Sequence, residues 1–290
     1  MSAASHRPVW IDMLLTALAP AIWGSTYIVA SELLPPDRPF TAALIRTLPA
    51  GLLLVAFMRH WPARGEWLRL LGLSGLNIAV FQALLFVAAY RLPGGLAAVV
   101  GAIQPLLVIA LTWAVDQRRP LQFTVWACVL GVIGMGVLLL SPDTVWEPVG
   151  IAAALAGAAC MATGNYLTRR WRSDMPVFAL TGWQLLLGGL MLAPVAFAID
   201  APLPRLSAMQ ISAYVYLSIA GALISYALWF RGLARLPQVA VSSLGLLSPL
   251  TAVILGWALL GQSLTGLSLL GLLIVLGSVL AVQWRSSRPA

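Results

Sequence analysis

The sequence contains no lysine and very little charge of either sign. Only 9% of its 290 residues are charged, and all 17 basic residues are arginines. Its two histidines, His6 and His60, lie outside the apolar runs, and neither Cys128 nor Cys160 has a nearby base. Without a general base, a metal-binding motif or an acidic pair, the chain offers no catalytic centre. We therefore expect no enzyme activity, no cofactor and no metal, with a polytopic membrane enzyme as a distant alternative.

Apolar residues are what the sequence has in excess. They make up 61% of the chain, and the mean hydropathy is +0.94, values typical of a protein that lives in lipid. The net charge of +8 could suit nucleic acid, but the arginines stand mostly singly or in pairs between apolar runs. Such a pattern is expected of loops beside a membrane. We expect a monomer that contacts membrane lipid and a small-molecule substrate, binds no nucleic acid, and uses its two cysteines for packing.

Ten apolar runs are long enough to cross about 30 Å of hydrocarbon as helices. The connectors between them are short and often contain proline, so none can fold as a separate domain. The first run is as long as a full span, and we therefore expect no cleavable signal peptide. The predicted spans cover residues 9–30, 40–58, 66–89, 94–115, 121–140, 147–169, 176–198, 207–231, 237–260 and 265–284.

The arginines sort to alternate connectors. With the N-terminus inside, thirteen fall on cytoplasmic segments and only three, Arg38, Arg91 and Arg205, on the opposite side. Basic residues accumulate on the cytoplasmic side of membrane proteins. The sequence therefore predicts a multi-pass protein of the bacterial inner membrane with both termini in the cytoplasm.

Part of the sequence occurs twice at an offset of 144 residues. An odd number of five spans per copy would insert the second copy upside down relative to the first. The predicted fold is all-α: a polytopic membrane protein with ten transmembrane helices as a 5+5 inverted repeat, divided into residues 1–141 and 142–290. The identical pairs are Ala83/Ala227, Leu84/Leu228, Phe86/Phe230, Arg91/Arg235, Leu92/Leu236, Pro93/Pro237, Gly101/Gly245, Pro105/Pro249, Leu106/Leu250, Leu111/Leu255, Trp113/Trp257 and Ala114/Ala258.

The run Ile22-Trp23-Gly24-Ser25-Thr26-Tyr27, the second span with Arg46, the Leu-Pro turns and the two Pro-Leu helices resemble the EamA family of the drug/metabolite transporter superfamily. The resemblance covers the chain as two consecutive repeats, although the second has Ala162-Thr163-Gly164 where the first has its Trp-Gly pair. It implies a central cavity lined by the first, third and fourth spans of each repeat. It also implies export of amino acids or other small metabolites, and aromatic and neutral amino-acid exporters are the most similar group.

Polar and aromatic side chains inside the spans are the candidates for binding a substrate, because such groups are costly in lipid. The repeat aligns Gln82 with Tyr226, and Arg46 with Gln184 at an offset of 138. We expect Arg46 and Gln82 in the outer third of the membrane, and Trp183, Gln184 and Tyr226 in the inner third, with an apolar layer between. Aromatic anchoring at the interfaces and hydrogen bonds between helices are alternative roles for these groups. The candidate cavity residues are Trp23, Tyr27, Arg46, Asn77, Gln82, Trp183, Gln184, Tyr226, Trp229, Ser242 and Ser243.

Arg46 is the ionisable side chain that lies deepest inside a span. A guanidinium cannot discard its charge, so it needs an anion or several hydrogen-bond acceptors. It could attract a substrate carboxylate, or it could pair with Glu32 or with carbonyls and pin two helices together, which is the simpler interpretation. A carrier of sugar phosphates or sugar nucleotides would need several cavity cations, which makes that cargo a distant option.

The fourth span of each copy carries a glycine and a proline four residues apart. Gly101 with Pro105, and Gly245 with Pro249, would bend these helices and form a hinge or gate, although a static kink is an alternative. No acidic residue lies at the middle of a span, which argues against a proton-coupled carboxylate and for uniport of neutral or zwitterionic cargo. The sequence thus predicts a secondary transporter that exports small metabolites, above all amino acids, by alternating access, with cationic drugs as the alternative cargo.

Overall fold

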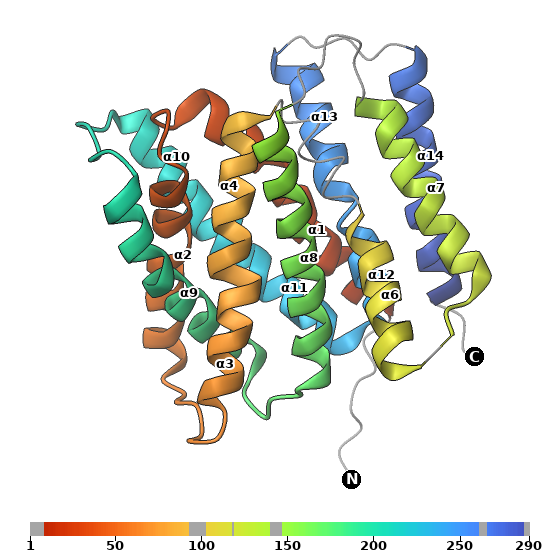
Figure 1. Ribbon diagram of the computed structural model, residues 1–290, viewed down its shortest axis with the longest axis horizontal. Helices are drawn as coiled ribbons and strands as arrows, with labels where there is room; N and C mark the ends of the chain where they lie inside the picture. The colour runs from red at the N-terminus through yellow and green to blue at the C-terminus, as the bar shows by residue number, and fades with distance from the viewer. Residues whose placement is uncertain (1–8, 93–102, 118, 140–146, 261–265, 287–290) are drawn as a thin grey trace.

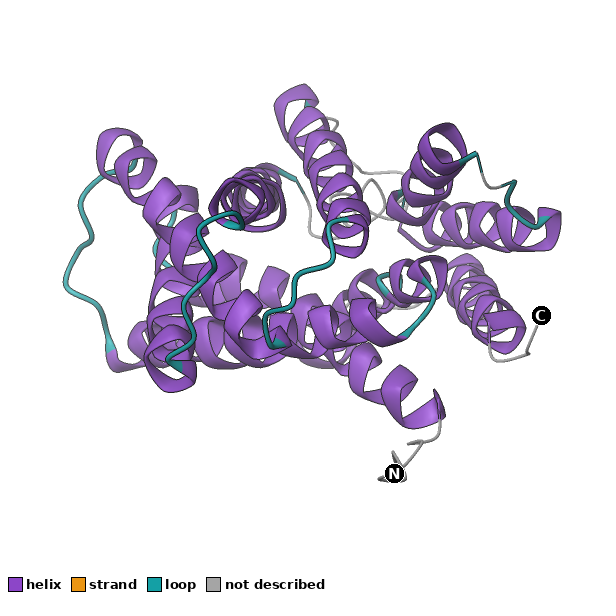
Figure 2. Ribbon diagram, turned by 90° about the horizontal axis from the view of Figure 1, so that it is seen from below, coloured by secondary structure: helices purple, strands orange, loops and turns teal. Residues whose placement is uncertain are grey.

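The computed structural model describes residues 9–92, 103–117, 119–139, 147–260 and 266–286, and this part of the chain is helical without any strand (Figures 1 and 2). The all-α prediction is therefore confirmed for these residues. Six helical segments are long and apolar enough to cross a membrane: Val9–Leu33, Pro39–Met58, Trp67–Arg91, Pro148–Arg170, Val177–Ile199 and Ala208–Arg235. Shorter apolar helices cover Gln104–Asp116, Gln122–Gly134, Leu247–Leu259 and Leu269–Val282.

Several of the long segments contain a π-helical turn. In chain order the elements are α1 (Val9–Ile28), η1 (Val29–Leu33), α2 (Pro39–Met58), α3 (Trp67–Ser74), η2 (Gly75–Val80), α4 (Phe81–Arg91), α6 (Gln104–Asp116), α7 (Gln122–Leu139), α8 (Pro148–Arg170), α9 (Val177–Ile199), α10 (Ala208–Ser218), η3 (Ile219–Ile224), α11 (Ser225–Arg235), α12 (Gln238–Leu244), α13 (Leu247–Leu260) and α14 (Gly266–Ser286). Local signals set several of these ends. Proline occupies the first turn of α2 and α8, the Glu147 carboxylate caps α8, and Ser207 with Gln210 forms a capping box on α10.

The sequence repeat is visible in the helix boundaries. The π segments η2 and η3 begin at Gly75 and Ile219, 144 residues apart, and the helices that follow them end at Arg91 and Arg235, again 144 apart. A π turn is a rare local widening of a helix and often marks a functional site. Its occurrence at the same place in both copies indicates that the two segments are structural equivalents.

The packing of the helices follows the same repeat. Helix α2 packs against α9 and α7 against α14, while α1 lies on α11 and α13 as α8 lies on α4 and α6. At the α2–α9 crossing, Gly51 meets the backbone of Leu186 and Gly189 meets Leu48, so that a side chain at either glycine would collide with the facing helix. Gly51 aligns with Gly189 and Leu48 with Leu186 at the offset of 138. The contact is therefore reciprocal, as expected where two equivalent elements meet.

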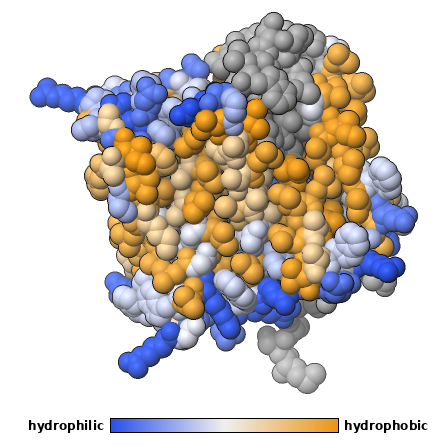
Figure 3. Space-filling model, in the orientation of Figure 1, coloured by the Kyte–Doolittle hydropathy of each residue, from blue (hydrophilic) through white to orange (hydrophobic). Residues whose placement is uncertain are grey.

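The outer surface of the helices is apolar. Phe57, Leu68 and Phe197 are more than 80% exposed, and Figure 3 shows a broad apolar zone between polar groups at the two ends of the helices. A contiguous apolar surface of this size suits lipid and not water. Both ends of the described chain lie toward the same end of the helices, together with the connector between α2 and α3 (Figure 1).

Candidate functional site

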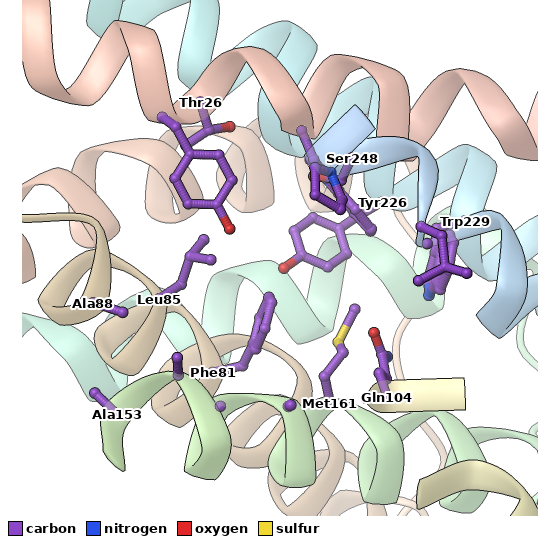
Figure 4. A pocket seen from close by; sticks show the side chains of 18 of the residues that line it. Thr26, Phe81, Leu85, Ala88, Gln104, Ala153, Met161, Tyr226, Trp229 and Ser248 are labelled. Carbon is purple, nitrogen blue, oxygen red and sulfur yellow. The ribbon is translucent and has the colours of Figure 1, made fainter. Parts of the chain in front are cut away.

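A cavity lies between helices from both halves of the chain, and Figure 4 shows many of its lining side chains. Its volume of about 100 Å³ is several times the roughly 10–15 Å³ that one water needs. This space suits a small organic molecule. The walls come from α1, α2, α4, the start of α6, α8, α11 and the break between α12 and α13; the lining residues are Trp23, Thr26, Tyr27, Arg46, Phe81, Leu85, Ala88, Gln104, Pro105, Ala153, Ala154, Gly157, Ala158, Met161, Tyr226, Trp229, Gly245, Leu246, Ser248 and Pro249.

One wall of the cavity is made by the small residues of α8. Ala153, Ala154, Gly157, Ala158 and Met161 recur at intervals of three and four, which places them on one face of the helix. Because the side chains of the three alanines and Gly157 are short, they leave room between α8 and the helices that face it. Phe81 and Leu85 of α4 extend this wall with larger apolar groups (Figure 4).

An aromatic cluster forms the opposite wall. The Trp23 ring lies 5.1 Å from the ring of Tyr226 and 5.2 Å from that of Trp229, measured between centroids, and both contacts are tilted. The indole N–H groups are satisfied within the protein: Trp23 Nε1 donates to the Gly221 carbonyl at 2.9 Å, and Trp229 Nε1 donates to Asn165 Oδ1 at 3.1 Å. The rings are therefore held in place and present apolar surface to the cavity.

Arg46 reaches the cavity wall from α2 with most of its hydrogen-bonding capacity unused. It is 1% exposed, and its Nη2 donates to the Gly221 carbonyl at 2.9 Å. Its Nε and Nη1 are buried without a hydrogen-bond partner. The expected ion pair with Glu32 is absent among the described residues, and Glu32 accepts a hydrogen bond from Ser31 instead. Of the partners expected for Arg46, Glu32 or backbone carbonyls, the structure shows only the Gly221 carbonyl.

The polar residues of the two copies meet instead of forming two separate layers. Gln82 Nε2 donates to the Tyr226 hydroxyl at 2.6 Å, so that two residues aligned at an offset of 144 touch directly. Asn77 Nδ2 donates to Gln184 Oε1 at 2.9 Å and to Thr168 Oγ1 at 3.1 Å. The expectation of an apolar layer between an outer and an inner polar layer was wrong, because these side chains are long enough to meet between the helices.

The predicted cavity residues lie in several different places. Trp23, Tyr27, Arg46, Tyr226 and Trp229 line the cavity. Asn77, Gln82 and Gln184 lie in the buried hydrogen-bond network behind it, and Ser243 is buried and donates to the Ala240 carbonyl. Trp183 lies in a different aromatic cluster beside Trp61 and Trp67, with its N–H on the His60 carbonyl. The side chain of Ser242 lies outside the described part of the structure.

The proline segments reach the cavity, but by a different geometry from the one expected. Pro105 is the second residue of α6, and Pro249 is the third residue of α13. Helix α12 ends at Leu244, so Gly245 and Leu246 form a break where we expected a continuous helix bent by proline. Proline fits the first turn of a helix, where its missing N–H costs nothing. Gly101 lies outside the described residues.

Ion pairs join the two halves of the chain at both ends of the helices. Asp12 of α1 pairs with Arg231 at 2.5 Å and with Arg235 at 3.5 Å, both on α11. At the other end, Arg91 of α4 pairs with Glu147 at the start of α8, at 3.2 Å. Arg91 and Arg235 are repeat equivalents, so each copy ties its third span to the first span of the other copy.

Comparison with known sequences identifies the family. The sequence model of the EamA-like transporter family matches this chain twice, over residues 10–140 and 148–284. The chain belongs to this family. EamA-like transporters are membrane proteins that carry small molecules, so the present chain is a multi-pass membrane protein with a lipid environment and a small-molecule substrate.

Individual members of the EamA-like family share much of this sequence. The chain is 42% identical to protein PecM of Dickeya dadantii over 268 residues, which cover 91% of this chain and 90% of PecM. It is 27% identical to the uncharacterized inner membrane transporter YicL of Salmonella typhimurium, over 96% of this chain and 97% of YicL. A crystal structure with 18% sequence identity superimposes with a TM-score of 0.79 over 95% of this chain and 97% of the other, which supports the fold.

The residues that sequence reasoning missed are mostly small or apolar. The α8 stripe could have been found from its spacing of three and four residues, which is the pattern of a helix face. Gln104 and Thr26 carry buried polar atoms without a partner and line the cavity, although neither sequence position stands out. Only the packing of the first half against the second shows that these residues face one space.

Proposed function

We propose that this EamA-like protein is a secondary transporter of the bacterial inner membrane that exports small metabolites, in particular neutral and aromatic amino acids. The observation that carries the proposal is the cavity itself, whose walls come from both halves of the chain. A site at the meeting of two repeats can be exposed to either side of the membrane when the repeats move against each other. Its apolar walls and aromatic cluster suit a cargo with a compact apolar body.

The proposed architecture consists of two five-helix halves, residues 1–141 and 142–290, in inverted orientation. The reciprocal glycine contacts of α2 and α9 and the direct bond between Gln82 and Tyr226 support this relationship, since equivalent residues meet where a twofold axis passes. Both termini would lie in the cytoplasm, as the arginine distribution indicates. The breaks beside Pro105 and Pro249 would let each fourth span bend as the cavity opens.

The transport step is expected to need no coupling ion. Among the described cavity residues none is acidic, and a carboxylate is the usual carrier of a coupled proton or cation inside a membrane. Cargo would then move down its own gradient. In liposomes, collapse of an imposed pH gradient should leave the rate unchanged as long as the substrate gradient is kept, and loss of transport would refute uniport.

The test of the function is transport by the purified protein in liposomes. Loaded vesicles are offered labelled amino acids in one series and cationic drugs in another, and counterflow is measured against protein-free vesicles. We expect counterflow of aromatic and neutral amino acids and none of the cationic compounds. The reverse pattern would overturn the amino-acid assignment in favour of drug export, and no counterflow in either series would argue against the proposed cargo classes.

A further inference from the structure

Arg46 lines the cavity with two donor nitrogens that have no hydrogen-bond partner, and this points to the chemistry of the substrate. We propose that the site recognises a carboxylate through Arg46, so that its substrates are small monocarboxylates with a compact apolar body, whether or not they also carry an ammonium group. This inference rests on the proposed transport function and narrows its cargo. It places 2-amino acids and simple carboxylic acids of the same skeleton in one class and excludes the corresponding amines.

The first support is that the Arg46 guanidinium lacks hydrogen-bond acceptors. Arg46 is 1% exposed, keeps its charge at any physiological pH and uses one donor nitrogen on the Gly221 carbonyl. Its Nε and Nη1 are buried without a hydrogen-bond partner, and the Phe86 ring, whose centroid lies 5.9 Å from Arg46 Cζ, compensates a buried charge only weakly. Nη2 shares one edge of the planar guanidinium with Nε and another edge with Nη1, so that one of these free groups and the second N–H of Nη2 can together bind both oxygens of one carboxylate.

The second support is the difference between the two copies at equivalent positions. Gln184, the repeat equivalent of Arg46, is held by the Asn77 side chain of η2 at 2.9 Å. The equivalent of Asn77 in η3 is Gly221, 144 residues later, which has no side chain to offer to Arg46. A β-carbon at Gly221 would lie 3.6 Å from Arg46 Nε, an ordinary contact, so space alone does not require glycine here. Gln184 thus has a side-chain partner from the other copy, whereas Arg46 has only the backbone carbonyl of Gly221.

The third support is the absence of a counter-charge in the cavity. The described lining residues include one arginine and no aspartate or glutamate. An ammonium group therefore has no ionic partner, and Arg46 repels an amine that lacks a carboxylate. A further buried donor without a partner, Gln104 Nε2, also lines the cavity and suits an anionic or carbonyl oxygen.

The experiment measures binding to the purified protein by the fluorescence of its tryptophans, of which Trp23 and Trp229 line the cavity. The probes are phenylalanine, 3-phenylpropionate and phenethylamine, which share a phenyl ring and differ in charged groups. We expect the two carboxylates to bind with affinities within about threefold of each other and the amine at least about tenfold more weakly, the usual worth of a hydrogen bond to a charged group. An amine that binds as tightly as the acids would overturn the proposal.

Three variants connect the effect to Arg46. Arg46→Gln introduces the residue of the second copy and should weaken both carboxylates by at least about tenfold while the amine gains or stays equal. Gly221→Asn should weaken the carboxylates beyond Gly221→Ala, because only asparagine offers Arg46 an internal oxygen. The control is Arg205→Gln, at an exposed connector position, which should leave all three affinities unchanged.

The outcomes separate the two proposals. Selective carboxylate binding without counterflow in liposomes would support the site and contradict the transport function. Counterflow of phenylalanine with unchanged affinity in a folded Arg46→Gln protein would support transport and overturn the role of Arg46. If Arg46→Gln does not fold, as judged by gel filtration, equal affinities of Gly221→Asn and Gly221→Ala would overturn the proposal on their own.

Discussion

Two tryptophans of this protein make nearly the same hydrogen bond in very different places. Trp23 Nε1 donates to the Gly221 carbonyl at 2.9 Å beside the cavity, and Trp183 Nε1 donates to the His60 carbonyl at 2.8 Å near the α2–α3 connector. Both were predicted to line the cavity, but only Trp23 does. The pair therefore separates a tryptophan that lines the cavity from one that anchors α9 to the α2–α3 connector.

Replacing each of these tryptophans by phenylalanine tests this distinction. Trp23→Phe removes ring area from the cavity and weakens the contacts with Tyr226 and Trp229, so we expect the KM of transport to rise by about threefold to tenfold, which corresponds to about 1 kcal/mol. Trp183→Phe loses a comparable hydrogen bond away from the cavity and should leave the KM within about twofold. Similar KM values for the two variants would contradict the assignment of Trp23 to the binding surface.

The contact between Gln82 and Tyr226 predicts a stability effect. Both side chains are fully buried, and the Tyr226 hydroxyl accepts the Gln82 amide proton at 2.6 Å. Tyr226→Phe should lower the free energy of unfolding by about 1–3 kcal/mol, because it leaves a buried amide unsatisfied. The double variant Gln82→Leu/Tyr226→Phe should lose less than the sum of the single variants, as measured by thermal unfolding in detergent. Additive losses would show that the bond contributes nothing.

The sequence predicted the chemistry of the site better than its shape. Arg46, the aromatic residues and the prolines stand out because polar, aromatic and helix-breaking residues are costly inside a membrane span. The α8 wall stands out only by its spacing, since Ala153, Gly157 and Ala158 are ordinary residue types in an apolar helix and their recurrence every three or four residues marks a face but not what that face contacts. Whether Trp183 or Trp23 faces the cavity depends on how one half packs against the other, and no spacing within a single helix contains that information.

Among the elements, the ion pairs at the two ends of the helices differ in burial. The side chains of Asp12 and Arg231 are 12% and 13% exposed, whereas those of Glu147 and Arg91 are 30% and 51% exposed. A partly buried pair is costly to break because one charge stays behind, whereas an exposed pair contributes about 0–1 kcal/mol. The contact of α1 with α11 should therefore be the stronger of the two.

Neutral substitutions measure that difference. Asp12→Asn leaves Arg231 without its carboxylate and should lower the free energy of unfolding by about 1–3 kcal/mol. Glu147→Gln keeps an oxygen that can cap α8 at Gly150 and should cost less than about 1 kcal/mol. Melting temperatures of the two purified variants give the comparison, and a larger loss for Glu147→Gln would contradict it.

The break between α12 and α13 gives the hinge proposal a specific location. Pro249 stands in the first turn of α13, just after Gly245 and Leu246, and lines the cavity. Pro249→Ala restores a backbone N–H and permits α12 and α13 to join as one stiffer helix. We expect transport to slow severalfold while expression and melting temperature stay close to wild type. Unchanged rates in both Pro249→Ala and Pro105→Ala would remove the hinge from the mechanism.

For the boundaries of the helices, the sequence repeat was more informative than hydropathy. The offset of 144 correctly pairs η2 with η3 and α4 with α11 to the residue, because equivalent sequences fold into equivalent local structures. Hydropathy alone predicted a continuous ninth span at 237–260, where the structure has two helices. Proline signals both a bend within a helix and the start of one, and only tertiary packing decides between them.

For the whole molecule, the charge distribution and the helix order make one joint prediction. The connector at residues 59–66 and the one at residues 200–206 lie at opposite ends of the helices in Figure 1. The first carries Arg59 and Arg64 and belongs to the arginine-rich side, which should face the cytoplasm. The second carries only Arg205 and should face outward. Orientation in the membrane is therefore testable with two positions.

Single cysteines placed in these connectors report the orientation directly. In a Cys128→Ala/Cys160→Ala background, Arg205→Cys should react with a membrane-impermeant maleimide added to intact cells, because position 205 is exposed in the outer connector. Arg64→Cys, also at an exposed position but at the other end of the helices, should react only after the cells are permeabilised. The reversed pattern would invert the topology, and labelling of both positions in intact cells would show that an even number of spans separates them, in place of the expected five. An inverted topology would also place the Asp12–Arg231 contact on the outer side of the membrane. The experiment therefore decides which side of the membrane each ion pair faces.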